Sequence, residues 1–260
     1  MDREHAAIAA ASALQGAFAG MAKSTAGSSG VKGRGGERQL KVRVKSARQR
    51  TASQTRWLER QLNDPYVAAA RKDGWRSRAV FKLKEIDERR KLLKSGQRII
   101  DLGAAPGGWS QYAAQQVKSI EGRGQVIAID ILEMEALAGV SFLHLDFLDP
   151  SAPDKLRRQL RDGAADVVLS DMAAATTGHN ATDHLRIMGL AETAAQFAIE
   201  VLAPGGVFLC KMFQGGTERE LLTMLKQSFA DIRHIKPPAS RKESSELYVL
   251  ASGFRRSKGE

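Results

Sequence analysis

Cysteine and clustered histidine are scarce in this chain. Its 260 residues include one cysteine, Cys210, inside the apolar run VFLCKMF. No intrachain disulfide framework is therefore possible, and a buried, reduced thiol is expected. The five histidines are scattered along the sequence, so they do not form the spaced clusters that hold a metal ion. We expect neither a disulfide-stabilised secreted fold nor a metal centre.

Long apolar runs are also missing. No stretch reaches the roughly 18 consecutive apolar residues that a membrane span requires. The alanine-rich N-terminal stretch follows a mixed-charge start, Asp2 to His5, whereas a secretory signal begins with a basic region. We expect a cytoplasmic protein, a monomer, with no membrane partner.

Acidic residues are too few to balance the basic ones. There are 40 Lys and Arg against 29 Asp and Glu, which gives a formal net charge of +11. Such a charge indicates a polyanionic partner, because cations that displace counterions from phosphates supply most non-specific nucleic-acid affinity. An anionic membrane surface is the alternative. From Lys23 to Arg56 the chain is Gly/Ser-rich, then basic, with Glu37 as its one acid. We interpret residues 1–60 as a disordered basic extension that favours RNA, and 61–256 as the catalytic domain.

The segment IIDLGAAPGGWSQ, residues 99–111, has the pattern strand, tight turn, helix. It lacks the Gly-Lys-Ser/Thr of a phosphate loop, and the dinucleotide pattern G-x-G-x-x-G fails at Ala105. S-adenosylmethionine fits this geometry best, because the turn brings backbone close to a methionine moiety and an acid close to its ammonium. A turn that serves only helix and strand packing is the alternative. The residues expected around this ligand are Asp101, Gly103, Pro106, Gly107, Gly108 and Trp109.

Short apolar runs rich in β-branched residues alternate with helical patterns beyond residue 97. Such runs are typical of strands covered on both faces. They predict an α/β, Rossmann-like fold with about seven mostly parallel strands and a C-terminal antiparallel pair. The expected strands are 98–103, 125–130, 140–147, 166–173, 205–213, 231–238 and 246–254. The expected helices are 108–117, 183–202 and 218–229, with two more between residues 63 and 93 that separate at Gly74.

Aspartates close four of the expected strands: Asp101, Asp130, Asp146 and Asp171. The carboxyl ends of parallel strands form the ligand-binding edge of such a sheet. There Asp130 can accept both hydroxyls of a ribose, and Asp146 can accept the exocyclic amine of adenine. A single aspartate after a strand is usually a turn or helix cap, but four at consecutive strand ends favour a shared site.

Two lysines occur where apolar residues are expected. Lys211 lies in VFLCKMF and Lys82 in RAVFKLKEI, while Glu246 opens the last expected strand. Lysine is rarely buried without a partner, although a lysine at a strand end can also extend to solvent. Desolvation and a second nearby cation lower the pKa of a lysine amine. Two lysines and two acids that meet at the strand ends therefore predict a general base.

Several segments closely resemble the FtsJ/RrmJ family of bacterial S-adenosylmethionine-dependent ribosomal RNA 2′-O-ribose methyltransferases. They are RSRAVFKL, DLGAAPGGWSQ, SDMA, LAPGG, VFLCKMFQG and SRKESSELYVLASG, and the similarity runs from about Asp64 to Phe254. One loop departs from the pattern, because SDMA continues with alanine where the family commonly has proline. The resemblance implies a catalytic tetrad of Lys82, Asp171, Lys211 and Glu246, and cofactor contacts at Gly107, Trp109, Asp130, Asp146 and Asp171.

The hypothesis for function is methylation of a ribose 2′-hydroxyl with Lys211 as the general base. The resemblance implies a uridine in 23S rRNA of the 50S particle as the substrate. We expect RNA contacts at Arg76, Arg78 and Arg241. Two alternatives stay open: a methyltransferase for another substrate, although the N-P-P-Y/F loop of amino-methyltransferases is absent, and a non-catalytic ribosome-assembly factor.

Overall fold

A computed structural model describes residues 51–174, 178–215 and 218–255. The chain divides into two compact units, Met1–Asp64 and Pro65–Glu260. The basic extension expected over residues 1–60 lies outside the described residues up to residue 50.

The first unit contains one described helix, α2 (Ala52–Leu62). This helix crosses the boundary expected after residue 60, so the last part of the segment interpreted as a disordered extension is helical. The division into an extension and a catalytic domain stays a prediction. Its sequence, ASQTRWLERQL, is rich in the good helix formers Gln, Arg, Leu and Glu. The side-chain amide of Asn63 donates to the carbonyl of Glu59 at 2.7 Å and closes the last turn.

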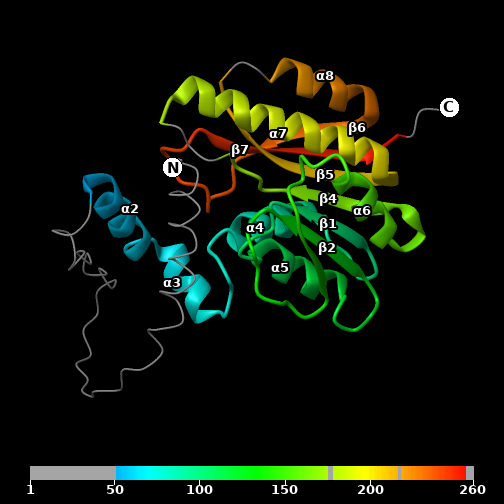
Figure 1. Ribbon diagram of the computed structural model, residues 1–260, viewed down its shortest axis with the longest axis horizontal. Helices are drawn as coiled ribbons and strands as arrows, with labels where there is room; N and C mark the ends of the chain where they lie inside the picture. Colours follow the sequence, from blue (N-terminus) through cyan, green and yellow to red (C-terminus); the bar gives the residue numbers. More distant parts are fainter. Residues whose placement is uncertain (1–50, 175–177, 216–217, 256–260) are drawn as a thin grey trace. The chain divides into compact units, whose positions relative to one another are not determined.

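The second unit is built on a seven-stranded sheet in the order β3-β2-β1-β4-β5-β7-β6. Figure 1 shows the part of the sheet from β2 to β6. The five strands from β3 to β5 are parallel, and β7 pairs antiparallel with both β5 and β6. The predicted fold is confirmed. The strands are β1 (Arg98–Leu102), β2 (Gln125–Asp130), β3 (Val140–His144), β4 (Ala165–Ser170), β5 (Leu202–Phe213), β6 (Phe229–Ile235) and β7 (Glu246–Phe254).

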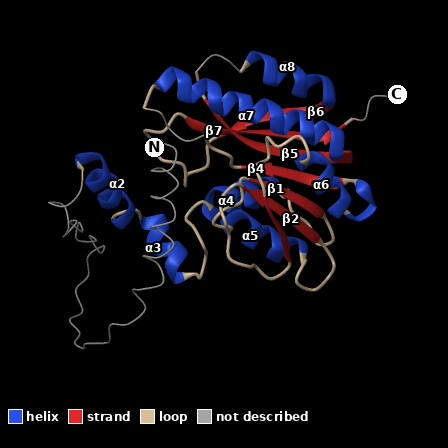
Figure 2. Cartoon of the chain, in the orientation of Figure 1, coloured by secondary structure: helices blue, strands red, loops and turns tan. Residues whose placement is uncertain are grey.

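Helices cover both faces of the sheet, as Figure 2 shows. On one face α4 (Val80–Arg90) and α5 (Gly108–Val117) pack against buried residues of β1, β2 and β4. On the other face α6 (Ala152–Gln159), α7 (Asn180–Val201) and α8 (Arg219–Ser228) enclose a second core. The short helix α3 (Pro65–Lys72) precedes α4, and the two helices separate around Gly74 as expected. Within the described ranges, no helix is both long and apolar enough to cross a membrane.

Several elements differ from the expected ones. The sequence analysis does not predict α6, because Ala152 and Leu156 are its only buried residues and one such pair is too little for a helical pattern. Strand β3 ends at His144, so Asp146 lies beyond it. Strand β5 begins at Leu202, because Leu202 pairs with Ala165 of β4. The register then shifts across the rest of the LAPGG segment before Val207 pairs with Val167.

Candidate active site at the carboxyl ends of the strands

Strand register brings Asp171 and Lys211 together. Ser170, the last residue of β4, is the register partner of Cys210 in β5. The residues that follow them, Asp171 just beyond β4 and Lys211 within β5, therefore lie at the same edge of the sheet. The Lys211 ammonium is 3.1 Å from Oδ1 of Asp171 and donates to the Asp171 carbonyl at 2.5 Å. Lys211 is only 7% exposed, so it does not extend to solvent but has an acidic partner.

A second buried ion pair joins two segments that are far apart in the sequence. Lys82 of α4 donates to Oε2 of Glu246, the first residue of β7, at 2.8 Å. Their side chains are 11% and 13% exposed. The structure thus arranges the predicted tetrad as two ion pairs, Lys211–Asp171 and Lys82–Glu246.

Tyr248 connects the two ion pairs. It stands directly opposite Lys211 in the β5–β7 register, and its hydroxyl donates to Oδ1 of Asp171 at 2.8 Å. Its ring centroid lies 5.7 Å from Nζ of Lys82 and 5.6 Å from the ring of Trp109. The sequence motifs do not point to this residue. The alternation of Glu246 and Tyr248 along β7 is the signal that could have identified it, because both then project to one face.

Charges around Asp171 keep it ionised. Burial favours the neutral acid, but the positive charges of Lys211 and Lys82 and the hydrogen bond from Tyr248 outweigh burial and hold the pKa of Asp171 below its ordinary value. Burial and the neighbouring Asp171 carboxylate raise the pKa of Tyr248 well above its ordinary value. Tyr248 is therefore a neutral donor to an anionic Asp171.

Tyr248→Phe is expected to lower the free energy of unfolding by about 1–3 kcal/mol, because it removes a buried hydrogen bond to a charged group. Urea denaturation measures this change. Tyr66→Phe is the matched control, because the Tyr66 hydroxyl also donates to a carboxylate, Glu85, at 2.9 Å, but at a half-buried position. An equal or smaller loss for Tyr248→Phe than for the control would contradict the role assigned to Tyr248.

Ser240 supports the second ion pair from the loop between β6 and β7. Its hydroxyl donates to Oε1 of Glu246 at 2.7 Å, so both Glu246 oxygens have a donor. The loop itself is fixed at Ala239, whose amide donates to Glu85 at 2.7 Å and whose carbonyl accepts from Arg78 at 2.5 Å. Sequence reasoning does not identify Ser240, because nothing in the sequence fixes how this loop folds.

Asp101 is buried at the end of β1. Ser110 of α5 donates to its Oδ2 at 2.6 Å, whereas Oδ1 has no hydrogen-bond partner among the described residues. Burial raises the pKa of Asp101 to about 7, the Ser110 hydrogen bond lowers it, and the Asp171 and Asp130 charges raise it. An unpaired buried carboxylate oxygen costs free energy in the ligand-free protein.

The glycines of the turn serve close packing. Gly103 and Gly107 have φ of +75° and +103°, which other residues rarely adopt. A Cβ on Gly103 would lie 2.9 Å from the Cα of Met172, and one on Gly107 would lie 3.1 Å from Cδ of Arg76. Gly108 leaves space for the side chain of Ser77. Packing against the segment before α4 therefore explains part of a pattern that the sequence analysis attributes to a ligand.

The other expected cofactor residues have different surroundings. Asp130 accepts from the amides of Ala105 and Leu132, each at 2.8 Å, and so fixes the turn beside it. Burial raises its pKa, and these hydrogen bonds oppose the rise. Asp146 is exposed and accepts from the amide of Leu148 at 2.9 Å. Pro106 is also exposed, at the tip of the turn.

Trp109 lies in the core. It is 3% exposed, and its indole nitrogen donates to the carbonyl of Ala79 at 2.8 Å. The ring packs beside that of Tyr248, so Trp109 helps to position the residue that connects the two ion pairs. Its expected contact with a cofactor stays a prediction.

Two of the three arginines expected to contact RNA bind backbone carbonyls. The Arg76 guanidinium donates to Glu135 at 2.7 Å and to Ala136 at 2.6 Å, and Arg78 donates to Ala239. Arg241 lies half-buried in the loop between β6 and β7. Arg76 and Arg78 thus hold two loops at the rim of the site.

Comparison with solved structures agrees with this fold. A crystal structure from Plasmodium falciparum, assigned as a ribosomal RNA methyltransferase, superposes with a TM-score of 0.62 at 30% identity and covers 69% of this chain and 98% of that chain. The shared fold and the 30% identity with this protein indicate that the chain is of the methyltransferase class.

Curated relatives identify the family. The ribosomal RNA large subunit methyltransferase E of Azorhizobium caulinodans is 62% identical over 218 residues, which are 84% of this chain and 90% of the relative. The protein of that name from Parvibaculum lavamentivorans is 59% identical over 238 residues, 89% and 93% of the two chains. The FtsJ-like methyltransferase model matches residues 75–254. The chain belongs to this family, which confirms the predicted resemblance and an enzymatic activity.

Proposed function

We propose that this protein transfers a methyl group from S-adenosylmethionine to a ribose 2′-hydroxyl of ribosomal RNA, at a uridine in the 23S rRNA of the 50S particle. The carrying observation is the Lys211–Asp171 pair, with Nζ 3.1 Å from Oδ1, at the ligand-binding edge of an FtsJ-like fold. The relatives named for the large ribosomal subunit support the substrate class. A cytoplasmic location and a monomeric state remain predictions.

The turn after β1 fits the proposed cofactor. Oδ1 of Asp101 lacks a partner among the described residues, and an ammonium group or a water that bridges to it would supply the missing donor. Asp130 ends β2 and Asp146 follows β3, and they would hold the ribose and the adenine. Gly103, Pro106, Gly107 and Gly108 would line the methionine end. When bound, S-adenosylmethionine supplies an electrophilic methyl group.

Lys211 is the proposed base. The Lys211 ammonium must first release a proton to solvent, and the uncharged amine then has two N–H donors and one lone pair. Nζ of Lys211 faces both Oδ1 and the carbonyl oxygen of Asp171, so one residue can use both donors. The lone pair is then left to accept the proton of the ribose hydroxyl. Base catalysis contributes about 10²- to 10⁴-fold, and alignment of the reactants contributes the larger share.

The remaining members of the tetrad position Lys211 and the ribose. Asp171 orients the amine and balances its charge once it has accepted the proton. Lys82 would hold the ribose or its phosphate. Glu246 fixes Lys82 by accepting its hydrogen bond at 2.8 Å, and Ser240 in turn donates to Glu246 at 2.7 Å. Arg241 would contact RNA directly. Arg76 and Arg78 would act mainly through the loops to which they donate.

Transfer of labelled methyl from S-adenosylmethionine tests the proposal. The acceptors are undermethylated 50S particles, 30S particles, free rRNA and protein, and the product is mapped for 2′-O-methyl nucleotides. Label on a 23S uridine is the expected result. Label on protein, or no transfer although the cofactor binds, would contradict the proposed substrate and support one of the two alternatives.

A further inference from the structure

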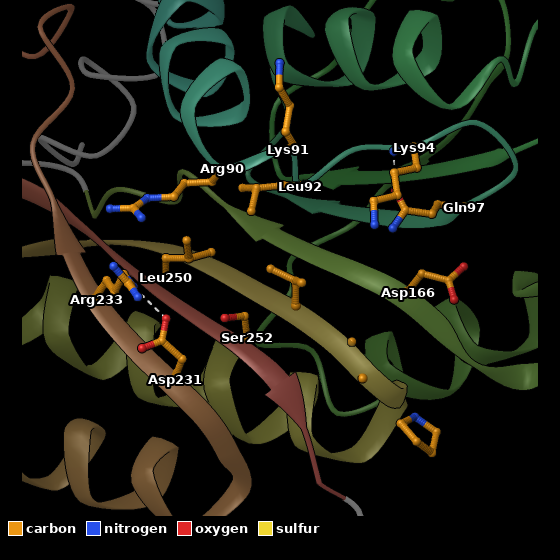
Figure 3. Close-up of a pocket in the computed structure, with 14 residues that line it drawn as sticks. Arg90, Lys91, Leu92, Lys94, Gln97, Asp166, Asp231, Arg233, Leu250 and Ser252 are labelled. Atoms are coloured by element: carbon orange, nitrogen blue, oxygen red, sulfur yellow. Dashed lines mark hydrogen bonds and ion pairs between the residues drawn. The ribbon is translucent and has the colours of Figure 1, made fainter.

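A shallow basic hollow of about 370 Å³ lies at the amino-terminal ends of the parallel strands, the edge of the sheet opposite the tetrad. Figure 3 shows it between the end of α4, the start of β5 and the strands β6 and β7. Its floor includes Leu92, Val207 and Leu250, and Ser252 contributes a hydroxyl. None of these residues belongs to the proposed active site.

The acids in the hollow already have partners. Asp166 accepts from the Arg98 guanidinium at 2.9 Å and 3.0 Å and from the Arg98 amide at 2.8 Å. Asp231 accepts from Nε of Arg233 at 2.6 Å. Both carboxylates are therefore neutralised by cations adjacent to them.

Two exposed cations in the hollow have no such partner. Within the part of the chain that the structure describes, Arg90 and Lys94 form no ion pair, and both are exposed. Figure 3 shows Arg90 extending over the hollow on the side of Arg233, with Lys94 further along beside Gln97, whereas Lys91 points away. The hollow thus carries an excess of positive charge over polar and apolar walls, which suits an anion with several oxygens.

We propose that this hollow binds backbone phosphates of the ribosomal RNA substrate as a second contact, with Arg90 and Lys94 as its main cations. The inference rests on the proposed function. RNA is favoured over an acidic protein because the whole chain carries a formal net charge of +11 and because guanidinium and ammonium groups over a shallow wall suit phosphates. A strand of five residues, such as β1, spans about 17 Å. An RNA that reaches both edges of the sheet must therefore be folded or long.

The test is Arg90→Gln/Lys94→Gln in the full chain, measured by binding to naked 23S rRNA fragments over a range of salt concentrations. The slope of log affinity against log salt is expected to fall by about 1.5, and affinity at about 0.1 M salt to fall at least about tenfold. Methylation of 50S particles should show a raised KM with kcat unchanged, since neither residue lies at the tetrad. Lys155→Gln/Arg158→Gln is the matched control, because it removes two exposed cations from α6.

The outcomes separate this inference from the proposed function. Wild-type protein that neither binds nor methylates rRNA would overturn both. If the wild-type protein methylates rRNA but the double variant and its control have equal slopes of log affinity against log salt, the second contact alone would be overturned. A weaker interaction with 50S particles but not with naked rRNA would indicate a ribosomal protein as the partner, and would also overturn the RNA contact. The double substitution could also destabilise α4, because cations near the end of a helix interact with its dipole. Urea denaturation of the variant distinguishes such a loss of stability from a loss of RNA contact.

Discussion

Lys211→Ala is expected to reduce the rate of methyl transfer by about 10²- to 10⁴-fold and to leave the binding of S-adenosylmethionine unchanged. The alanine cannot accept the hydroxyl proton, and no other amine lies within ion-pair distance of Asp171 among the described residues. The cofactor turn is separate from this change, because its hydrogen bonds join Asp101, Ser110, Asp130 and Ala105. Single-turnover transfer to 50S particles measures the rate, and calorimetry measures cofactor binding.

Removal of one partner of a buried ion pair also destabilises the fold by about 3–5 kcal/mol. Lys211→Arg separates the two effects, because a guanidinium keeps the charge beside Asp171 but remains protonated at neutral pH. We expect Lys211→Arg to unfold later in urea than Lys211→Ala and to remain inactive. Lys226→Ala, an exposed lysine of α8, is the control and should transfer methyl normally. Wild-type turnover by either Lys211 variant would remove this residue from the base role.

The members of the tetrad could be predicted singly, but not their pairing. Lys211 and Lys82 interrupt apolar patterns, and Asp171 ends a predicted strand, so each of them can be recognised from the residues next to it in the sequence. The ion pair between Lys82 and Glu246 spans 164 positions, and its geometry depends on how α4 packs beside β7. Only the family resemblance links such distant residues in a sequence. Strand register then explains why Tyr248 faces Lys211.

The turn after β1 is the part of the site that the sequence predicts least completely. A glycine next to a ligand and a glycine next to another segment look identical in a sequence. Ser77 and Arg76 occupy the space beside Gly108 and Gly107. They belong to a segment about thirty residues earlier, and only tertiary packing brings it next to the turn. For the same reason, the charge of Arg76 could be predicted, but its hydrogen bonds to the loop carbonyls of Glu135 and Ala136 could not.

Asp101→Asn is expected to change how the stability of the ligand-free protein depends on pH. Burial raises the pKa of Asp101 to about 7, above its ordinary value of 3.8. Between these values the folded state holds a proton that the unfolded state has released. The stability contribution of the protonated form is therefore complete below about pH 4 and is lost as the pH rises through 7. Asparagine does not ionise, so the variant lacks this loss.

Relative to wild type, Asp101→Asn should gain on the order of 3 kcal/mol in free energy of unfolding between about pH 5 and pH 8. At the acidic end it should be the less stable protein by about 1–3 kcal/mol, because its buried amide then has an unsatisfied donor where Oδ1 lacks a partner. Urea denaturation across this pH range measures the difference.

Asp149→Asn is the control that should not change across this range. Hydrogen bonds from Ser151 lower the pKa of Asp149 from its ordinary value of 3.8, so the stabilising effect of its carboxylate is already complete above about pH 4, and the difference between this variant and wild type should be constant between about pH 5 and pH 8. A flat difference curve for Asp101→Asn, like that of the control, would show that Asp101 is ionised throughout. If the difference rises as expected, a variant that is more stable above pH 7 and binds S-adenosylmethionine more weakly would indicate that the buried carboxylate is kept for the cofactor, at a cost in stability.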